Sequence, residues 1–462
     1  MAASVSSARS AREHDLADLP ASSQRSRSDH HARGAEFASG RALCDVCVVK
    51  VHPKLARARA KLERKLIRGW ERAVFSAPQT ADGSHEQRVV EGPGPLEAND
   101  PRAASLVVAL MHEAEAAASA GLVKHAYVID ARHRLEVDAR HGHVKQRELD
   151  AQTVDKIMGG KDRALRPDRS ADLLRAIGIM NADGTISARN AKKYKQVNHL
   201  VELCRPTWAG RTSEQPLRIV DLACGNSYLS FVLLEALRLE GIEARLLGVD
   251  LREDVVTTSR ARADQLGFGE QARFVVASLE SLELDAVRDG LGGAPDLAIS
   301  LHACDTATDA ALTLAVRAGV ESILCVPCCQ AELARQLGEP KSRARAGAAL
   351  VPATVEQGLL RRSLGELLTD GLRVELLEAC GYELGVLEFV ASSHTPKNLL
   401  LRAKRARSLA PAQWRLDPVR DRCAQLGVDP ALLRSLTQLA EQAAQAEQGD
   451  RDGAEPERTP SS

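Results

Sequence analysis

Five short apolar runs recur in the second half of the chain, separated by segments with a helical pattern. Starting at Leu217, they read LRIVDLAC, ARLLGVDL, ARFVVASL, LAISLHAC and SILCVPCC. A strand that is apolar on both faces must be covered on both faces, and a helix after each strand provides that cover. The alternation therefore predicts an α/β fold built on a doubly wound, Rossmann-like parallel sheet.

Two further apolar runs end this region, GYELGVLEFV at residues 381–390 and KNLLLRAKR at 397–405. The connection ASSHTP is too short for a helix, so the two runs are expected to pair antiparallel. A parallel sheet closed by such a hairpin is the layout of class I methyltransferases.

Length and composition exclude several classes of protein. A chain of 462 residues is too long for one hydrophobic core. Lys plus Arg and Asp plus Glu both number 62, so any attraction to nucleic acid must come from local patches. No run reaches the roughly 18 apolar residues that a membrane span needs. The ten cysteines lie mostly in apolar runs, which indicates reduced thiols and a cytoplasmic setting.

Changes in composition predict four segments. They are a disordered tail (1–43), a small basic α+β domain that could recognise substrate (44–190), the sheet domain (191–410) and a helical, mobile C-terminal tail (411–462).

A basic amphipathic helix is expected over residues 51–76, where eight Lys or Arg stand against Glu63 and Glu71. It is either a solvated surface helix or a face that contacts phosphates, and charge alone does not separate the two. A loop is expected at 92–101, then a helix at 103–120.

A hairpin is expected at residues 125–144, because Tyr127, Leu135 and Val137 alternate with polar residues. Its histidines have no ligand framework around them, so we interpret them as solvated strand residues: His125, His133, His141 and His143.

A glycine turn follows the first apolar run, in the segment DLACGNSYLS at residues 221–230. Gly225 lets the backbone approach a nucleotide-like ligand at the start of the next helix, although Ala223 and Ser227 stand where glycines are common. Asp250 ends the second run, where a carboxylate can accept both hydroxyls of a ribose.

The ligand at this turn is expected to be cationic. The third run ends in Ser278 and Leu279, which would flank an adenine. Asp221 and the absence of Lys or Arg near the turn in the sequence suit a sulfonium ligand, so S-adenosylmethionine is favoured over NAD. Solvated strand-end acids in an inactive domain are the alternative.

Reactive side chains follow the fourth and fifth runs, in SLHACD at 300–305 and VPCCQ at 326–330. The carboxyl ends of adjacent parallel strands meet at one edge, so these side chains are expected to converge: His302, Cys304, Asp305, Cys328 and Cys329.

Several chemical roles remain open for this group. His302 or Asp305 could accept a proton while the protein orients an in-line methyl transfer. Alternatively, Cys328 or Cys329 could attack a pyrimidine, since RNA cytosine-5 methyltransferases place cysteines at these strand ends. The cysteines could also be buried and inert.

A metal site is the least favoured role. It would use His302, Cys304, Cys325 and Cys328, but strand alternation separates Cys325 from Cys328, and we expect no metal. The isolated pair Cys44 and Cys47 is interpreted as incidental.

Long motifs between Lys161 and Arg405 resemble a known family. They are KDRALRP, KKYKQVNHLVEL, DLACGNSYLS, SLHACDTATD, VPCCQ and EFVASSHTPKNLLLRAKR. They resemble a bacterial family of class I S-adenosylmethionine-dependent methyltransferases and, more distantly, eukaryotic methyltransferase-like proteins and tRNA 2'-O-methyltransferases.

The resemblance implies the fold, the cofactor and the residues around it. Those expected at the cofactor are Asp221, Ala223, Gly225, Asn226, Asp250, Leu251, Ser278 and Leu279. The HACD and PCCQ runs would face the acceptor.

The expected activity is methyl transfer to RNA, either tRNA or rRNA. A basic track for its phosphates would comprise Arg402, Lys404, Arg405 and Arg407. A small-molecule or protein methyltransferase and a non-catalytic cofactor-binding module are the alternatives.

Overall fold

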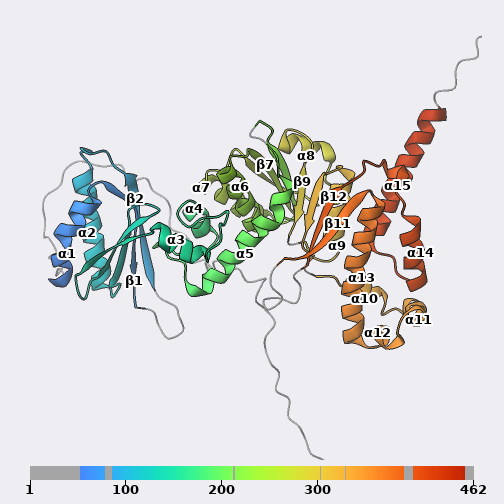
Figure 1. Cartoon of the computed structure of the whole chain (residues 1–462), viewed down its shortest axis with the longest axis horizontal. Coiled ribbons are helices and arrows are strands. Elements are labelled where there is room, and N and C mark those ends of the chain that lie inside the picture. Colours follow the sequence, from blue (N-terminus) through green and yellow to red (C-terminus); the bar gives the residue numbers. More distant parts are fainter. Residues whose placement is uncertain are drawn as a thin grey trace, which may run out of the picture. The chain divides into compact units, whose positions relative to one another are not determined.

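The computed structural model describes residues 53–78, 86–211, 214–301, 303–327, 329–389 and 399–452. Residues 449–452 are described by their backbone alone. The chain divides into two compact units, the first ending at Glu148 and the second starting at Leu149 (Figure 1). Among the described residues, no helix combines the length and the apolar character needed to cross a membrane.

The first unit is a five-stranded antiparallel sheet with two helices packed on it. Its elements are α1 (Pro53–Leu66), β1 (Gly69–Ser76), β2 (Gln87–Pro95), α2 (Ala103–Ser119), β3 (Lys124–Val128), β4 (His133–Asp138) and β5 (Val144–Glu148). The strand order is β2-β1-β3-β4-β5. Apolar side chains of both helices form one core with Phe75, Tyr127 and Leu135 of the sheet. The antiparallel pair β3–β4 confirms the expected hairpin.

The expected basic helix is shorter than predicted, because it ends at Leu66 and residues 69–76 form β1. Gly69 adopts φ +100°, and a Cβ there would lie 2.0 Å from the carbonyl oxygen of Gly94. Glycine therefore lets β1 and β2 approach closely. β2 also occupies residues 92–95, where a loop was expected, since an edge strand tolerates proline and glycine.

His125 is a core residue, which corrects its interpretation as a solvated histidine. It is 2% exposed. Its Nε2 lies 2.8 Å from the carbonyl oxygen of Leu122, and its ring packs edge-on to Phe75 at 4.7 Å. Strand alternation turns it inward with Tyr127.

The second unit holds a seven-stranded sheet in the order β11-β12-β10-β9-β6-β7-β8. The strands are β6 (Leu217–Leu222), β7 (Ala244–Asp250), β8 (Ala272–Val276), β9 (Leu297–Ser300), β10 (Ser322–Cys325), β11 (Tyr382–Glu388) and β12 (Leu399–Arg405). Strands β6 to β10 are parallel. β11 and β12 form the expected antiparallel hairpin, and β12 joins it to β10. The doubly wound sheet predicted from the apolar runs is confirmed.

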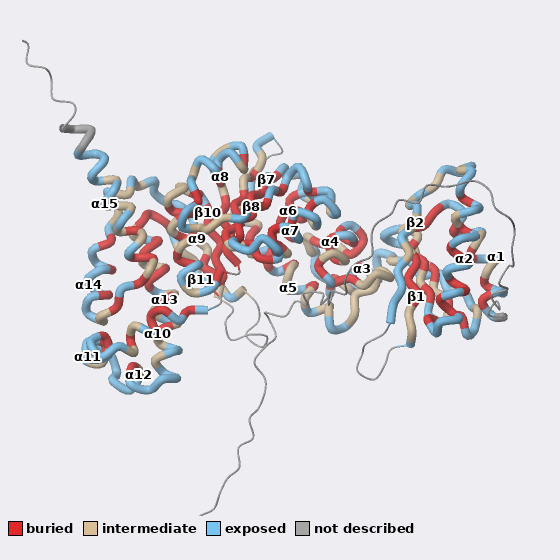
Figure 2. The backbone as a smooth tube through the Cα atoms, turned by 180° about the vertical axis from the view of Figure 1, so that it is seen from behind, coloured by how far each residue is buried: buried red, intermediate tan, exposed pale blue. Residues whose placement is uncertain are grey.

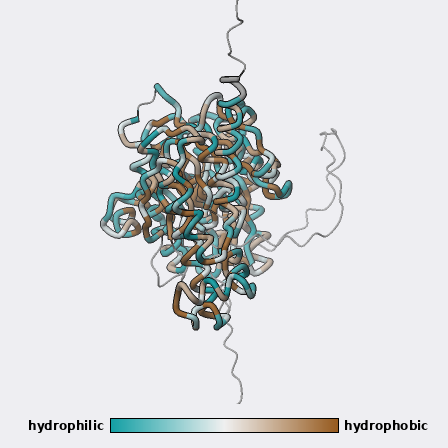
Figure 3. The backbone as a smooth tube through the Cα atoms, turned by 90° about the vertical axis from the view of Figure 1, so that its right-hand side faces the viewer, coloured by the Kyte–Doolittle hydropathy of each residue, from teal (hydrophilic) through white to brown (hydrophobic). Residues whose placement is uncertain are grey.

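Helices cover both faces of this sheet (Figures 1 and 2). One face carries α4 (Ala171–Ala176), α5 (Ala188–Cys204), α6 (Tyr228–Glu240) and α7 (Glu253–Gln265). The other carries α8 (Leu284–Leu291), α9 (Thr306–Arg317), α13 (Gly358–Ala379), α14 (Asp417–Leu426) and α15 (Ala431–Asp452). Apolar and polar stretches alternate along the chain, as one-sided helices require (Figure 3).

Five further short elements belong to this unit: α3 (Ala151–Met158), η1 (Arg205–Thr207), α10 (Glu332–Gln336), α11 (Pro340–Ala349) and α12 (Pro352–Glu356). A second 3₁₀ turn, η2 (Pro411–Gln413), precedes α14.

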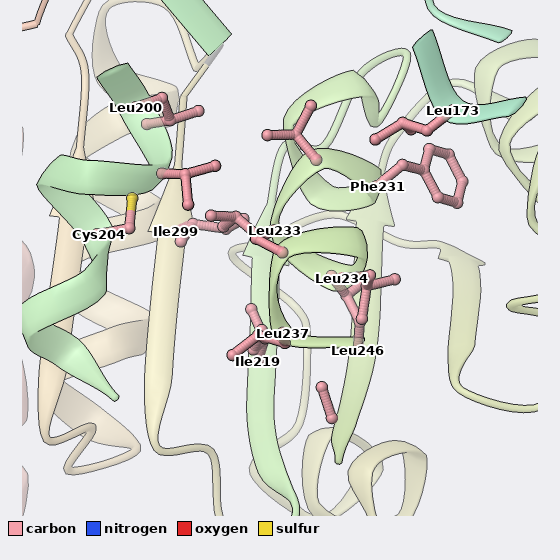
Figure 4. Packing of buried hydrophobic residues seen from close by; sticks show 14 of the residues in the cluster. Leu173, Leu200, Cys204, Ile219, Phe231, Leu233, Leu234, Leu237, Leu246 and Ile299 are labelled. Carbon is pink, nitrogen blue, oxygen red and sulfur yellow. The ribbon is translucent and has the colours of Figure 1, made fainter. Parts of the chain in front are cut away.

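The compact units divide earlier than the boundary expected near residue 190. Leu173 of α4 packs beside Phe231, and Leu200 and Cys204 of α5 lie toward Ile299 in the same core (Figure 4). Residues from α4 onward therefore belong to the sheet unit. The basic composition of this stretch reflects its outer surface, while the apolar residues that decide its placement are widely spaced.

The C-terminal segment also differs from the expected mobile tail. Val419 and Cys423 of α14 and Leu432, Leu433 and Leu436 of α15 are buried in the core on the second face of the sheet. Their spacing of three and four residues is that of an apolar helix side. This segment up to residue 436 is part of the domain core.

Packing of α5 on the sheet predicts a large effect of Leu200→Ala. The side chain is fully buried, so its truncation should lower the free energy of unfolding of the second unit by about 2–5 kcal/mol. Leu367→Ala is the matched control, since this leucine is 72% exposed and should change the value by less than about 0.5 kcal/mol. Urea denaturation of the full chain measures both, and equal effects would contradict the packing.

Candidate active site

The glycine turn lies between β6 and α6, at the carboxyl edge of the parallel strands. Ala223, Gly225 and Ser227 have φ values of 61°, 52° and 54°. Left-handed backbone at three of five successive residues makes the turn tight, and the two non-glycine residues are strained there. A Cβ at Gly225 would meet no heavy atom within 4 Å. The space beside Gly225 is thus open to a ligand.

Asp250 ties this turn to the end of β7. The amide of Gly225 donates to Asp250 Oδ2 at 2.8 Å, and the amide of Arg252 donates to Oδ1 at 2.9 Å. Asp250 is 8% exposed. A carboxylate oxygen has two lone pairs, so each oxygen keeps one acceptor position for a further donor such as a ribose hydroxyl.

Helix α7 supports the turn from behind. The hydroxyls of Ser227 and Ser259 lie 2.9 Å apart. Arg262 Nη1 donates to the carbonyl oxygen of Asn226 at 2.7 Å, and its guanidinium lies 4.6 Å above the Tyr228 ring. Sequence reasoning missed Arg262 as a neighbour of the turn.

The turn therefore does have arginines near it, contrary to the expectation from sequence. Arg252 Nε also lies 3.5 Å from Asp250 Oδ1. Arg262 lies 37 positions after Gly225 in the sequence, and only the packing of α7 brings it to the turn. The preference for a cationic ligand now depends on the carboxylates of Asp221 and Asp250.

Asp221 lies beneath the turn and has an unusual pKa. Burial raises the pKa of its carboxyl to about 7; the Ser230 hydroxyl that donates to it lowers the pKa, and the nearby charge of Asp250 raises it further. Two carboxylates that share a buried region favour a cation between them.

Apolar side chains are exposed at the ends of β7 and β8. Leu251 is 71% exposed and Val276 is 45% exposed, and both directly adjoin the strand ends. Ser278 and Leu279 are half-buried beside them. An exposed apolar rim next to a carboxylate suits the flat face of an adenine. Val276 was missed because strand alternation places it on the same face as buried Ala272 and Phe274, and only its position at the end of the strand exposes it.

On the acceptor side, the loops after β9 and β10 do meet. The amide of Asp305 donates to the carbonyl oxygen of Cys329 at 2.8 Å. Cys304 and Cys329 are both exposed. His302 and Cys328 lie outside the described residues, so the structure does not show whether the expected group is complete.

Asp305 acts as a clamp between these loops. Its Oδ1 accepts the amides of Ala331 and Glu332 at 2.9 and 3.0 Å, and its Oδ2 accepts Arg335 Nη2 at 2.9 Å. Its φ of 51° places it in the left-handed region, where a non-glycine residue persists only if its surroundings hold it. Because both of its carboxylate oxygens already accept hydrogen bonds, Asp305 is better suited to position the loops than to accept a proton.

A buried arginine holds the same loops from α13. Arg373 is 1% exposed. Its Nε and Nη2 bind the Asp309 carboxylate at 2.8 and 3.1 Å, and Nη2 also donates to the carbonyl oxygen of Asp305 at 3.0 Å. Asp370 bridges Arg373 and Gln330. Arg373 lies 64 residues from Asp309, so sequence spacing gives no signal for this pair.

Of the four side chains considered for a metal site, Cys325 is a core residue, and His302 and Cys328 lie outside the described residues. Burial raises the pKa of the Cys325 thiol to about 12, because the side chain is fully enclosed in the core. It cannot approach a metal at the loop. Within the described ranges, no three His, Cys, Asp or Glu side chains cluster as metal ligands would.

Comparisons with known proteins agree with this architecture. Residues 192–336 match the family model of a methyltransferase domain. This match includes the glycine turn, Asp250 and both acceptor loops. No curated protein matches the chain.

Several solved structures are similar. An SAH-bound methyltransferase from Podospora anserina is 13% identical over 56% of this chain and 97% of that chain, with a TM-score of 0.31. The methyltransferase domain of a bacterial Hen1 is 15% identical over 46% of this chain and 99% of that chain, with a TM-score of 0.30. Precorrin-6y C5,15-methyltransferase from Geobacter metallireducens is 12% identical over 45% of this chain and 87% of that chain, with a TM-score of 0.26. Such low scores add nothing to what the strand order shows.

The residues present fit S-adenosylmethionine. The open space at Gly225, the remaining acceptor positions of Asp250 and the apolar rim at Leu251 correspond to the backbone approach, ribose and adenine of this ligand.

Asp250→Ala should weaken binding of S-adenosylmethionine by about 1.5–3 kcal/mol, since charge-assisted hydrogen bonds to the ribose are lost. Isothermal titration calorimetry on the full chain measures this. Asp254→Ala, at an exposed position in the first turn of α7, is the matched control and should leave affinity unchanged. Equal affinities of both variants would place the pocket elsewhere.

Asp221 predicts a pH dependence of stability. Its folded pKa of about 7 lies above the ordinary 3.8, so the folded state retains a proton that the unfolded state loses. The free energy of unfolding should therefore fall between about pH 4 and pH 7 and level off above. Asp221→Asn keeps an oxygen that can accept a hydrogen bond from Ser230. Because asparagine does not titrate, the decrease in the free energy of unfolding between pH 4 and pH 7 should be smaller by a few kcal/mol in this variant. Denaturation at pH 5 and pH 8 compares the two proteins, and a pH-independent difference would contradict the raised pKa.

Proposed function

The chain is an S-adenosylmethionine-dependent methyltransferase with a class I domain, and from this premise we propose that its acceptor is RNA, either tRNA or rRNA. The observation that carries the proposal is a basic stripe along α1 of the first unit. We also propose that the chain is related to the bacterial methyltransferase family with HACD and PCCQ runs. Its proposed location is the cytoplasm.

The stripe comprises exposed residues on one side of α1 and the turn after it: Lys54, Arg57, Lys61, Arg64 and Arg68. At about 100° per residue they fall within an arc of roughly 80°. Another side of the helix carries the buried row of Leu55, Ala58, Leu62 and Leu66. The only carboxylate on the helix, Glu63, pairs with Arg59 at 2.8 Å.

Two lysines of α1 contact strand β5. Lys61 Nζ donates to the carbonyl oxygen of Val144 at 3.2 Å, and Lys65 Nζ donates to Gln146 Oε1 at 2.6 Å. Lys145 and Arg147 alternate with these residues along the strand and so point to the other face of the sheet, where Arg147 Nε pairs with Glu136 at 3.2 Å. A row of cations with few acids between them fits the phosphates of a nucleic acid.

The track expected at the end of the sheet domain is less suited to this role. β12 runs antiparallel, and Lys404 lies opposite Ser322, the first residue of β10. Lys404, Arg405 and Arg407 therefore lie at the amino edge of the parallel strands, opposite to the glycine turn. Arg402 is half-buried.

The chain's own residues would hold and orient the reactants. When bound, S-adenosylmethionine supplies a methyl carbon activated for in-line displacement by an acceptor atom. Asp250 and the Gly225 turn would fix the adenosyl end. Asp305 and Arg373 would keep the acceptor loops in place, so that the acceptor meets the methyl group in one orientation.

The acceptor class is tested by transfer of tritium from labelled S-adenosylmethionine in an extract of a deletion strain. Label in the RNA fraction supports the proposal. Label in protein or small molecules alone, or the absence of transfer despite cofactor binding, would favour the rival acceptors or a non-catalytic module.

The stripe makes a second prediction, with Arg57→Gln combined with Arg64→Gln. Loss of two phosphate contacts should reduce the slope of log affinity for RNA against log salt by about 1.4–1.8. Lys404→Gln combined with Arg407→Gln is the control, since these residues also carry exposed charge. Filter binding over a salt series measures the slopes, and equal slopes for wild type and the α1 variant would remove α1 from the RNA site.

A further inference from the structure

A cavity of about 380 Å³ opens beside the loop after β10. It lies between α10 and the first turns of α13. Its ten lining residues include Cys329, Gln330, Arg335, Arg361, Arg362 and Glu366. Three guanidinium groups thus face one carboxylate in this lining, and four of the ten residues are alanine or glycine, which leaves the space open.

The start of α13 adds to the positive potential of the cavity. The helix begins at Gly358, has no acidic residue in its first turn and continues with Arg361 and Arg362. Arginines near a helix N-terminus oppose the helix dipole, whereas an anion there is favoured by the dipole and by the arginines together.

Two of the arginines are already held in place. Arg335 Nη2 binds Asp305 Oδ2 at 2.9 Å, and Arg361 Nη1 donates to the carbonyl oxygen of Val355 at 2.8 Å. Arg362 pairs only loosely with Glu366, at 3.3 Å, and its side chain is 68% exposed. An arginine with remaining donors in a fixed plane is suited to two-point binding of a phosphate.

The cavity adjoins the acceptor loops. Cys329 lines it, and the carbonyl oxygen of Cys329 accepts the amide of Asp305. We propose that this cavity binds a phosphate group of the RNA acceptor and thereby sets which nucleotide atom reaches the methyl group. This inference rests on the proposed function and deepens it, because it assigns the acceptor's anchoring group.

Arg362→Gln tests the site without disturbing the clamp at Asp305. In the full chain, calorimetry with inorganic pyrophosphate as the probe should show a dissociation constant about tenfold higher than that of wild type. Arg362→Lys should recover part of the affinity, since it restores the charge but not the planar fork. Arg288→Gln is the matched control: this exposed arginine of α8 also pairs within its own helix, with Asp285.

The same variants are then assayed with the RNA fraction that accepts label. Arg362→Gln should lower kcat/KM about tenfold and leave affinity for S-adenosylmethionine unchanged, while Arg288→Gln changes neither. Equal pyrophosphate affinities of wild type and Arg362→Gln would overturn the inference, even if RNA is methylated. Arg362-dependent pyrophosphate binding without RNA labelling would support the anion site and reject RNA as the acceptor.

Discussion

The hydrogen bond from the Gly225 amide to Asp250 is the contact on which the cofactor side of the domain depends. It joins the turn after β6 to the tip of β7 at 2.8 Å, and it fixes the direction in which the carboxylate offers its remaining lone pairs. The strained residues Ala223 and Ser227 persist because α7 supports the turn through Ser259 and Arg262. The turn after β6 therefore fixes its own backbone, the Asp250 carboxylate and the start of α6 together.

The acceptor side is built on a second clamp of a different kind. Asp305 and Arg373 join loops that come from β9 and β10 to helices α10 and α13. The side chains of Asp305 and Arg373 make their hydrogen bonds to other groups of the protein. The cofactor side thus presents hydrogen-bond acceptors to a ligand, whereas the acceptor side holds the walls of the cavity beside Cys329.

The sheet could be predicted from sequence because each of its parallel strands is a nearly continuous apolar run, and such a run must be covered on both faces. The hairpin β11–β12 followed from the short connection. The start of β1 at Gly69 could not be predicted, since close contact with Gly94 is a tertiary constraint that overrides a helical pattern. Asp221, Gly225 and Asp250 could be proposed from sequence because they lie at the end of a strand or in the turn directly after one. Arg262 and Arg373 were missed because only folding brings them near, and His302 and Cys328 stay predictions.

We infer that the carboxyl edge of β6, β7 and β8 holds the adenosyl group. The most direct measurement is a crystal structure of the full chain with S-adenosylhomocysteine. We expect ribose hydroxyls within hydrogen-bonding distance of Asp250 and the adenine against Leu251 and Val276. Electron density for the ligand at the amino edge of these strands, or in the first unit, would contradict the account.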